Sequence, residues 1–245
     1  MKLRRYFTHI IFFLIAQVSC CFIAISQART TATGTYNQSL ELMTDVSGKP
    51  MYLKVNYNID GSPFYPEDYY RASLYTRGGK VYEGINVKFN MMDNLLVMKL
   101  DDETELVAVS PITRVLFTDS VRIGMLNTVF EKGFPPVGQQ TEQTYYEVLD
   151  SGRVKLLKQR SATYTDKKDY GQASITRVFE IKESYFLFFD GKMNKLTGGK
   201  DGLLALIPEK KEELNQYLVD NNLKCRKENE LSLAIAFYNS LFKKP

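Results

Sequence analysis

Apolar and polar residues alternate with a period of two through the middle of the chain, which is the pattern of strands with one buried face. In residues 85–91 (INVKFNM), an apolar residue stands at every second position. Similar short β-rich runs cover residues 95–100, 105–109, 114–118, 144–149, 153–158, 176–182 and 185–189. Gly78-Gly79 and Asp190-Gly191 permit the positive φ angles of tight hairpin turns. These features predict a mostly antiparallel sheet that forms a roll, a barrel or a sandwich.

The C-terminal segment changes to the helical period. Pro208 suits the first turn of a helix, and the residues behind it place Leu214 and Leu218 on one stripe. After Asn221-Asn222, apolar residues recur at helical spacing; they are Leu231, Ala234, Ile235, Tyr238, Leu241 and Phe242. A shorter helical turn fits residues 201–207. The predicted fold class is therefore α+β, mainly β, with two amphipathic helices in residues 208–245 packed as a hairpin on the sheet.

Two polar segments are predicted to be long loops. Residues 131–143 contain a Pro-Pro pair and several glutamines, and residues 159–174 have Tyr164 and Tyr170 as their only aromatic residues. Loops of this length are unusual inside a compact domain. Each is therefore either functional or mobile.

The first 28 residues have the layout of a secretory signal peptide. Basic residues near the start precede an apolar run from Ile10 to Ile25, and small residues lead to a predicted cleavage site after Ala28. The run, about 16 residues, is shorter than the roughly 20 that cross a bilayer, so a retained anchor is the weaker alternative. We expect a signal peptide (1–28) and a single exported β-rich domain (29–245) with no transmembrane span.

Lipidation of Cys20 or Cys21 is a second alternative for this segment. Gln17 occupies the position before Cys20 where a lipoprotein signal needs an aliphatic residue, and the apolar run continues past both cysteines. Cleavage after Ala28 is the favoured hypothesis, with a protein located in the periplasm or associated with the envelope. The signal peptide holds three of the 32 basic residues, so the rest is nearly neutral against 28 acidic residues. This charge does not indicate a nucleic-acid partner.

The residue types that remain after cleavage restrict the possible chemistry. The single histidine, His9, lies in the signal peptide, so no Ser-His-Asp or Cys-His mechanism and no histidine-based metal site is expected. Cys225 is the only remaining cysteine, which excludes an intramolecular disulfide. We expect neither a cofactor nor a bound metal.

Three local motifs have a functional and a plain structural interpretation. Residues 240–243 match S-x-x-K, but the companion motifs of penicillin-recognising enzymes are absent. Residues 197–202 (TGGKDG) resemble a phosphate loop, but Asn194 and Asp201 depart from its pattern, so a loop leading into a helix is favoured. The acidic residues 101–105 suit a solvated hairpin tip better than a calcium site.

Cys225 stands among basic residues, which lower the pKa of a thiol. A packed position between two helices is favoured over a reactive or intermolecular thiol.

The segment PFYPEDYY (63–70) is the candidate binding surface, because exposed tyrosines form hot spots for protein partners and stack on sugar rings. The candidate residues are Phe64, Tyr65, Tyr69 and Tyr70. The alternative is that these rings pack at one end of the sheet. The absence of tryptophan weakens a glycan site relative to a protein partner.

Residues 55–99 contain, in order, a Gly-x-Pro-aromatic element, a predicted strand, a Gly-Lys turn and the run VKFNMMDNLLV. Residues 208–241 form a predicted helical tail. Together they resemble a family of uncharacterised exported proteins of Gram-negative bacteria. The resemblance implies export and a β-rich fold, and it transfers no functional residue.

The leading hypothesis is a non-enzymatic envelope protein that binds or scaffolds an envelope protein or glycan. The alternative is a carboxylate-based hydrolase that acts on envelope polymers. Two carboxylates about 5–10 Å apart in a cleft, one with a raised pKa, would favour the hydrolase. An exposed apolar patch rimmed by polar residues would favour binding.

Overall fold

The computed structural model describes residues 41–44, 50–53, 57–100, 104–108, 112–118, 128–168 and 174–243. The predicted signal peptide lies outside these residues. The chain divides into two compact units, Met1–Lys54 and Val55–Pro245. In the first unit, β1 (Glu41–Thr44) and β2 (Pro50–Leu53) pair in an antiparallel manner. No sequence pattern had indicated a boundary at residue 54.

The described part of the second unit is built on one sheet of eleven strands. They are β3 (Tyr57–Asp60), β4 (Phe64–Thr76), β5 (Val81–Asn90), β6 (Leu95–Lys99), β7 (Glu105–Val107), β8 (Ile112–Phe117), β9 (Val129–Glu131), β10 (Tyr146–Asp150), β11 (Lys155–Lys168), β12 (Ile175–Phe189) and β13 (Lys192–Leu196). The order β13-β12-β11-β10-β9-β8-β4-β5-β6-β7 is antiparallel throughout, and β3 pairs in parallel with β12. The α+β, mainly β prediction is confirmed, with a sheet that is mixed and does not close.

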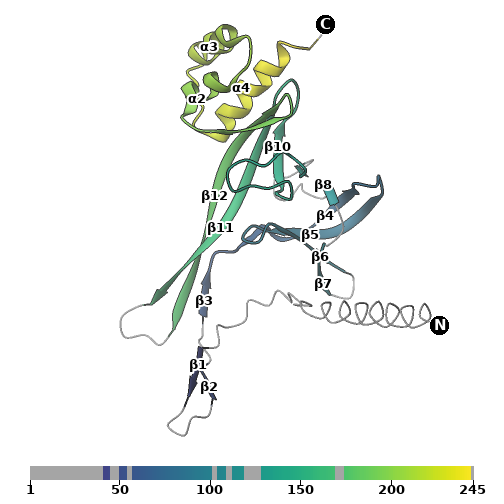
Figure 1. Ribbon diagram of the computed structural model, residues 1–245, viewed down its shortest axis with the longest axis vertical. Coiled ribbons are helices and arrows are strands. Elements are labelled where there is room, and N and C mark those ends of the chain that lie inside the picture. The colour runs from purple at the N-terminus through teal and green to yellow at the C-terminus, as the bar shows by residue number, and fades with distance from the viewer. Residues whose placement is uncertain are drawn as a thin grey trace, which may run out of the picture. The chain divides into compact units, whose positions relative to one another are not determined.

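Strands β11 and β12 form a long hairpin that corrects two predictions (Figure 1). The predicted loop at residues 159–174 is wrong for residues 159–168, which continue β11. The runs 176–182 and 185–189, predicted as separate strands, are parts of one strand. The hairpin pairs Lys155 with Phe188 and continues without a break to Lys168 and Ile175. Residues 159–168 carry mostly polar side chains on both faces, so this strand of the hairpin lacks the alternation that marks a half-buried strand.

The predicted turn at Asp190-Gly191 agrees with the structure, whereas Gly78-Gly79 lies in a longer turn between β4 and β5 in which only Gly79 has a positive φ angle (80°). Asp190 and Gly191 have φ angles of 47° and 71°, which a two-residue hairpin turn of type I′ requires. Residues 132–145 follow β9 as a loop with only an isolated bridge, which agrees with the loop predicted at residues 131–143 apart from its ends. Phe134 of this loop packs with Tyr146 and Phe186 against one face of the sheet.

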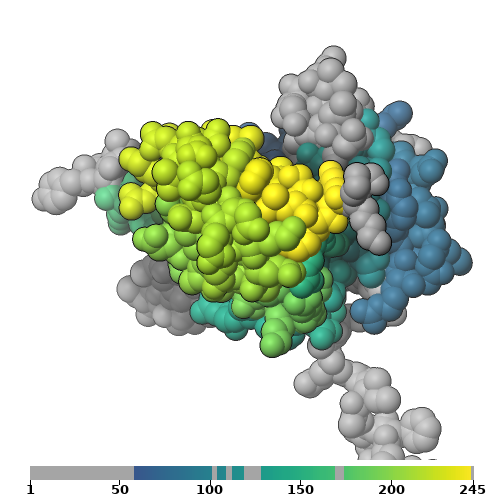
Figure 2. Space-filling model, turned by 90° about the horizontal axis from the view of Figure 1, so that it is seen from above, coloured from purple at the N-terminus to yellow at the C-terminus, as the bar shows by residue number. Residues whose placement is uncertain are grey.

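Helices cover the other face of the sheet at β10–β13 (Figures 1 and 2). They are α2 (Gly199–Leu206), α3 (Lys211–Asp220) and α4 (Glu228–Ser240). The structure therefore has three C-terminal helices where two were predicted, because the short helical turn is a full helix. Their shared core with the sheet contains Val154, Leu156, Leu187, Leu203, Leu214, Leu218, Leu231, Ile235 and Tyr238. No helix among the described residues is long and apolar enough to cross a membrane.

A buried amide attaches α4 to the turn between β10 and β11. The Asn239 side chain accepts a hydrogen bond from the Val154 N–H (3.0 Å) and donates one to the Val154 carbonyl (2.9 Å). A Cβ at Gly152 would lie 2.5 Å from Cγ of Asn239, so only glycine fits there. The helix is thereby held in one position on the sheet.

Candidate functional site

The four aromatic residues of the candidate binding surface lie on β4, and all are partly buried. Tyr65 and Tyr70 pack against the core formed by β4, β5, β6, β8 and β9. Between Tyr65 and Tyr70 the register with β5 shifts, so that Tyr65 faces Phe89 and Tyr70 faces Val87. All four rings therefore lie on one strand, but only Tyr65 and Tyr70 are anchored in the core.

The other two rings hold a lysine. The Lys88 ammonium lies 4.1 Å from the ring centroids of both Phe64 and Tyr69, a cation–π contact on two sides. Lys88 also pairs with Glu105 at 3.6 Å. Contact of Phe64, Tyr65, Tyr69 and Tyr70 with a partner stays a prediction.

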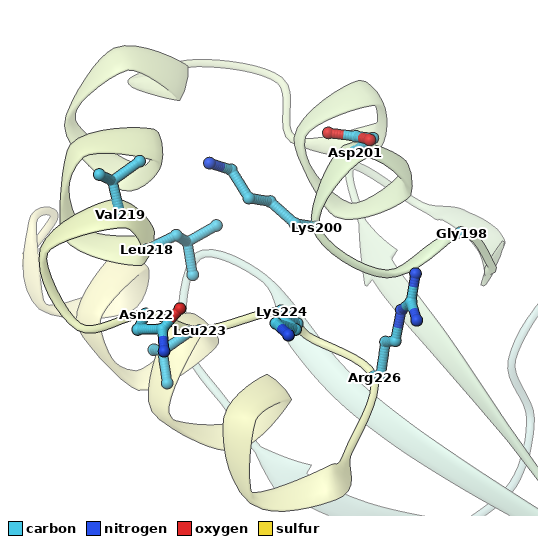
Figure 3. Close-up of a pocket in the computed structure, with 9 residues that line it drawn as sticks. All are labelled: Gly198, Lys200, Asp201, Leu218, Val219, Asn222, Leu223, Lys224 and Arg226. Atoms are coloured by element: carbon cyan, nitrogen blue, oxygen red, sulfur yellow. The ribbon is translucent and has the colours of Figure 1, made fainter.

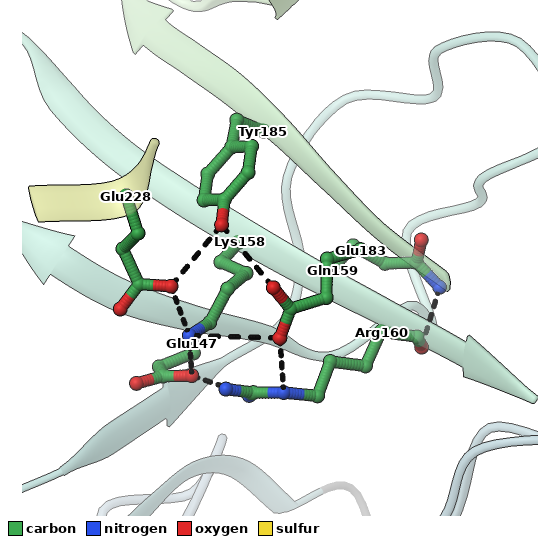
Figure 4. A network of polar contacts seen from close by, with 7 residues as sticks. All are labelled: Glu147, Lys158, Gln159, Arg160, Glu183, Tyr185 and Glu228. Atoms are coloured by element: carbon green, nitrogen blue, oxygen red, sulfur yellow. Dashed lines mark hydrogen bonds and ion pairs between the residues drawn. The ribbon is translucent and has the colours of Figure 1, made fainter. Parts of the chain in front are cut away.

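A network of charged side chains, of which Lys158 and Glu147 are buried, joins β10, β11 and β12 to the first turn of α4 (Figure 4). At its centre is Lys158, whose side chain is only 4% exposed. Its ammonium lies 2.6 Å from a carboxylate oxygen of Glu228, 3.2 Å from Glu147 and 4.0 Å from Glu183. Three carboxylates from three different elements therefore surround one lysine.

Arg160 links this network to the aromatic residues of β4. It forms short ion pairs with Glu147 and Glu183, and its guanidinium stacks 3.8 Å from the Tyr65 ring centroid. Burial alone would lower the pKa of Arg160, but the negative charge of Glu147 raises it. The Tyr65 ring therefore contacts Arg160 and the core within the protein.

Tyr185 completes the network between β12 and α4. Its hydroxyl is placed to donate a hydrogen bond to Glu228 (3.1 Å) or to Glu183 (3.2 Å). Burial and the two carboxylates raise the pKa of Tyr185, so the hydroxyl keeps its proton. Because Lys158, Arg160 and the carboxylates are all ion-paired, the arrangement suits a structural joint between sheet and helix.

Two of the three sequence motifs take their plain structural interpretations, and the third, the acidic segment 101–105, stays a prediction. The Ser240 hydroxyl donates a hydrogen bond to the Phe237 carbonyl (2.6 Å), as serines in helices do. Residues 197–202 lead into α2. Residues 101–103 of the acidic segment lie outside the described residues. Elsewhere in the described chain, no group of three or more His, Cys, Asp or Glu side chains could hold a metal ion.

Cys225 is buried between the helices, as favoured from the sequence. Burial raises the pKa of its thiol to about 11, with the nearby Glu230 adding to the effect. The thiol is therefore protonated at neutral pH and poorly reactive.

The distal half of the β11–β12 hairpin, here called the ribbon (residues 162–168 and 175–181), has an open edge. β11 pairs with β10 only at residues 156–158. Beyond that point the Ala162 N–H donates to the Met91 carbonyl (3.2 Å). For residues 163–168, β12 is the one strand partner found in the described chain, and all six side chains are exposed.

One face of the ribbon carries exposed apolar side chains. The strand register places Tyr164, Ile181 and Ile59 of β3 on this face, and they are 43%, 44% and 58% exposed. The Tyr164 ring contacts Phe179, with 6.0 Å between the ring centroids. Arg177 stacks 4.0 Å from Tyr164 and forms two hydrogen bonds of 2.8 Å with Asp166. Exposed apolar side chains and the Asp166–Arg177 ion pair therefore lie side by side on this face of the ribbon.

Sequence reasoning missed the network and the β11 half of the ribbon. The only local signal for the network was that Lys158 and Arg160 follow the apolar Leu156 on the same face of a strand. The β12 half of the ribbon was predicted as the run 176–182, whereas its β11 half, residues 162–168, had no apolar alternation to reveal it.

Comparison with protein families, curated proteins and solved structures finds no match for this chain. The resemblance to exported proteins of Gram-negative bacteria therefore stays a prediction.

Proposed function

We propose that this protein is an exported, non-enzymatic binding module that captures an extended segment of an envelope protein along the ribbon. The observation that carries the proposal is the open edge of β11 at residues 163–168, beside the patch of Tyr164 and Ile181. An exposed edge offers unpaired backbone donors and acceptors to another strand. Strand addition of this kind is a common mode of peptide recognition.

The direction of the backbone groups supports this mode. The N–H of Ala162 points away from β12, since it donates to Met91. Backbone groups alternate sides along a strand, so those of Tyr164, Asp166 and Lys168 face the open edge as well. An added strand would bond to these groups and place alternate side chains on the patch.

Pairing of β3 with the opposite edge supports the same mode. Residues 57–60 come from a distant part of the sequence and add in parallel to β12 at residues 175–178. A two-stranded ribbon is marginally stable in water by itself. A further strand on β11 would stabilise it, with Lys167 and Lys168 favouring an acidic residue at one end of the partner segment.

The hydrolase alternative receives less support. A general acid needs a raised pKa, whereas the pKa of Asp166, Asp190 and Glu228 is lowered in each case. For Asp166 and Asp190 the largest cause is a hydrogen bond from an arginine. Glu147 and Glu183 are ion-paired with Arg160.

Photo-crosslinking in intact cells tests the binding mode. A photoreactive phenylalanine analogue in place of Tyr164 should give one dominant protein adduct, whose crosslinked peptide is an extended segment. The same analogue in place of the exposed Glu213 on α3 serves as the control and should give no such adduct.

A proline variant separates edge pairing from simple contact. Asp166→Pro removes an N–H that faces the open edge and should abolish the adduct. Asp166→Asn keeps that N–H and should retain the adduct. Equal adducts from Tyr164 and Glu213, or an adduct that survives Asp166→Pro, would contradict strand addition.

Export is tested by the intact mass of the protein purified from its native host. We expect a chain that begins at Arg29, since cleavage is predicted after Ala28. A diacylglycerol group on Cys20 or Cys21 would show instead that the protein is a lipoprotein.

A further inference from the structure

A pocket of about 360 Å³ lies among the helices, between the start of α2 and the α3–α4 connection (Figure 3). Three cationic residues line it: Lys200 from α2, and Lys224 and Arg226 from the connection. Asp201 is the one carboxylate in the lining. The pocket shares no residue with the ribbon, so a ligand could bind in it whether or not the ribbon captures a strand.

The side chains of the three cationic residues, Lys200, Lys224 and Arg226, form no ion pair within the described chain, although Asp201 lines the same pocket. The nearby Glu230 carboxylate accepts a hydrogen bond from the backbone N–H of Arg226 (3.2 Å) and forms no ion pair with the guanidinium. By contrast, Arg153, Lys155, Lys158, Arg160 and Arg177 each contact a carboxylate. Cations held around a hollow repel one another, and a bound anion would relieve that repulsion.

The glycines of the TGGKDG segment bring the cations together. The Lys200 N–H donates to the Lys224 carbonyl (2.9 Å), which joins the two basic segments. A Cβ at Gly199 would lie 2.8 Å from that carbonyl and 3.3 Å from Cγ of Arg226. The stem of Arg226 therefore lies against Gly199, and its guanidinium reaches up beside Gly198 (Figure 3).

The same segment needs a second glycine. A Cβ at Gly202 would lie 1.5 Å from the Thr197 carbonyl oxygen, so the chain turns back on itself there. The two glycines thus bring together the backbone segments that carry the basic residues. The arrangement differs from a phosphate loop, in which backbone N–H groups hold the ligand.

Apolar residues form the other wall. Leu218 is buried, Leu223 is partly buried, and Val219 is exposed at the edge of the pocket. In Figure 3, Lys200 extends across the opening toward Val219. A ligand would therefore meet positive charge on one side and hydrocarbon on the other.

We propose that this pocket binds a phosphomonoester group attached to an apolar moiety. Three cations and one carboxylate leave the lining with a surplus of two positive charges. A phosphomonoester carries about 1.5 to 2 negative charges at pH 7, which matches this surplus. An arginine guanidinium binds two phosphate oxygens at once, and Leu218 and Leu223 would contact the apolar moiety.

Binding of soluble phosphates tests the pocket. Titration calorimetry should show that hexyl phosphate binds more tightly than inorganic phosphate, because only hexyl phosphate reaches the apolar wall. Loss of a hydrogen bond to a charged group costs a factor of about ten or more, so Arg226→Gln and Lys200→Gln should each weaken binding by that factor. Lys211→Gln, an exposed position on α3 outside the pocket, should leave binding unchanged.

Vesicles distinguish a soluble ligand from a lipid head group. Phosphatidylcholine vesicles with phosphatidic acid present a monoester, and vesicles with phosphatidylglycerol present a diester. Binding of hexyl phosphate with neither vesicle indicates a soluble ligand, and additional selective binding to phosphatidic acid indicates a head group. The proposal is overturned if hexyl phosphate does not bind, or if Lys200→Gln and Arg226→Gln bind it as tightly as the unchanged protein does. It is also overturned if the protein binds only vesicles and does not distinguish phosphatidic acid from phosphatidylglycerol.

Discussion

Deletion of residues 227–245 is expected to give protein that aggregates or is degraded. The deleted segment contains α4, whose Leu231, Ile235 and Tyr238 are 2%, 0% and 0% exposed. Full burial of one large apolar side chain stabilises a protein by about 1.5–3 kcal/mol. The helix therefore contributes several kcal/mol, against a typical total stability of about 5–15 kcal/mol. Its loss would also expose the sheet face beneath it.

Two alanine substitutions on α4 provide a matched measurement. Ile235→Ala, at a fully buried position, should lower the free energy of unfolding by about 2–5 kcal/mol in urea titrations. Leu233→Ala, at a position that is 51% exposed, should change it by less than about 0.5 kcal/mol. A soluble truncated protein with an unchanged melting temperature would show instead that the helix is a detachable segment, and a partner site should then be sought on it.

The second large effect is expected from Lys158→Met. Removing one partner of a buried ion pair leaves the other charge uncompensated, which costs about 3–5 kcal/mol. The lower end of this range applies here, because the Glu228 side chain is 39% exposed. Lys155→Met on the same strand is the control. This substitution breaks the ion pair between Lys155 and Glu131, whose side chains are 30% and 22% exposed. It should lower the free energy of unfolding by about 1 kcal/mol or less.

The same pair predicts how stability depends on pH. Burial would raise the pKa of Glu228, but the hydrogen bond and positive charge of Lys158 lower it overall. A carboxyl with a lowered pKa in the folded state contributes stability above its unfolded pKa of about 4.3, and this contribution is lost as the pH falls through the folded pKa. Melting temperatures between about pH 6 and pH 3 should therefore fall less steeply in Lys158→Met, since Glu228 no longer has this cation. If the melting temperature falls equally steeply with pH in both proteins, the ion pair of Lys158 with Glu228 does not contribute to the acid dependence of stability.

Local patterns in the sequence were sufficient for much of the fold. The strand at residues 85–91 was predictable because its apolar residues alternate, and Val87 and Phe89 are indeed buried. Asp190-Gly191 predicted its turn through φ angles that few other residue pairs adopt. The stripe of Leu231, Ile235 and Tyr238 predicted α4, because one helical face must be buried for the helix to be stable. Each of these depends on residues that are close together in the chain.

The ribbon and the sites depended on tertiary structure. Residues 159–168 form a strand because β12 pairs with them. This pairing produces no apolar alternation in the sequence, because the side chains of residues 163–168 are exposed on both faces. Lys158 and Glu228 are 70 positions apart, and they meet only because α4 packs on β11. Lys200 and Lys224 come together because Gly199 lets two chain segments touch. The sequence by itself determined the elements that periodicity and turn chemistry specify, whereas the charge network, the open edge and the basic pocket arose from contacts between distant elements.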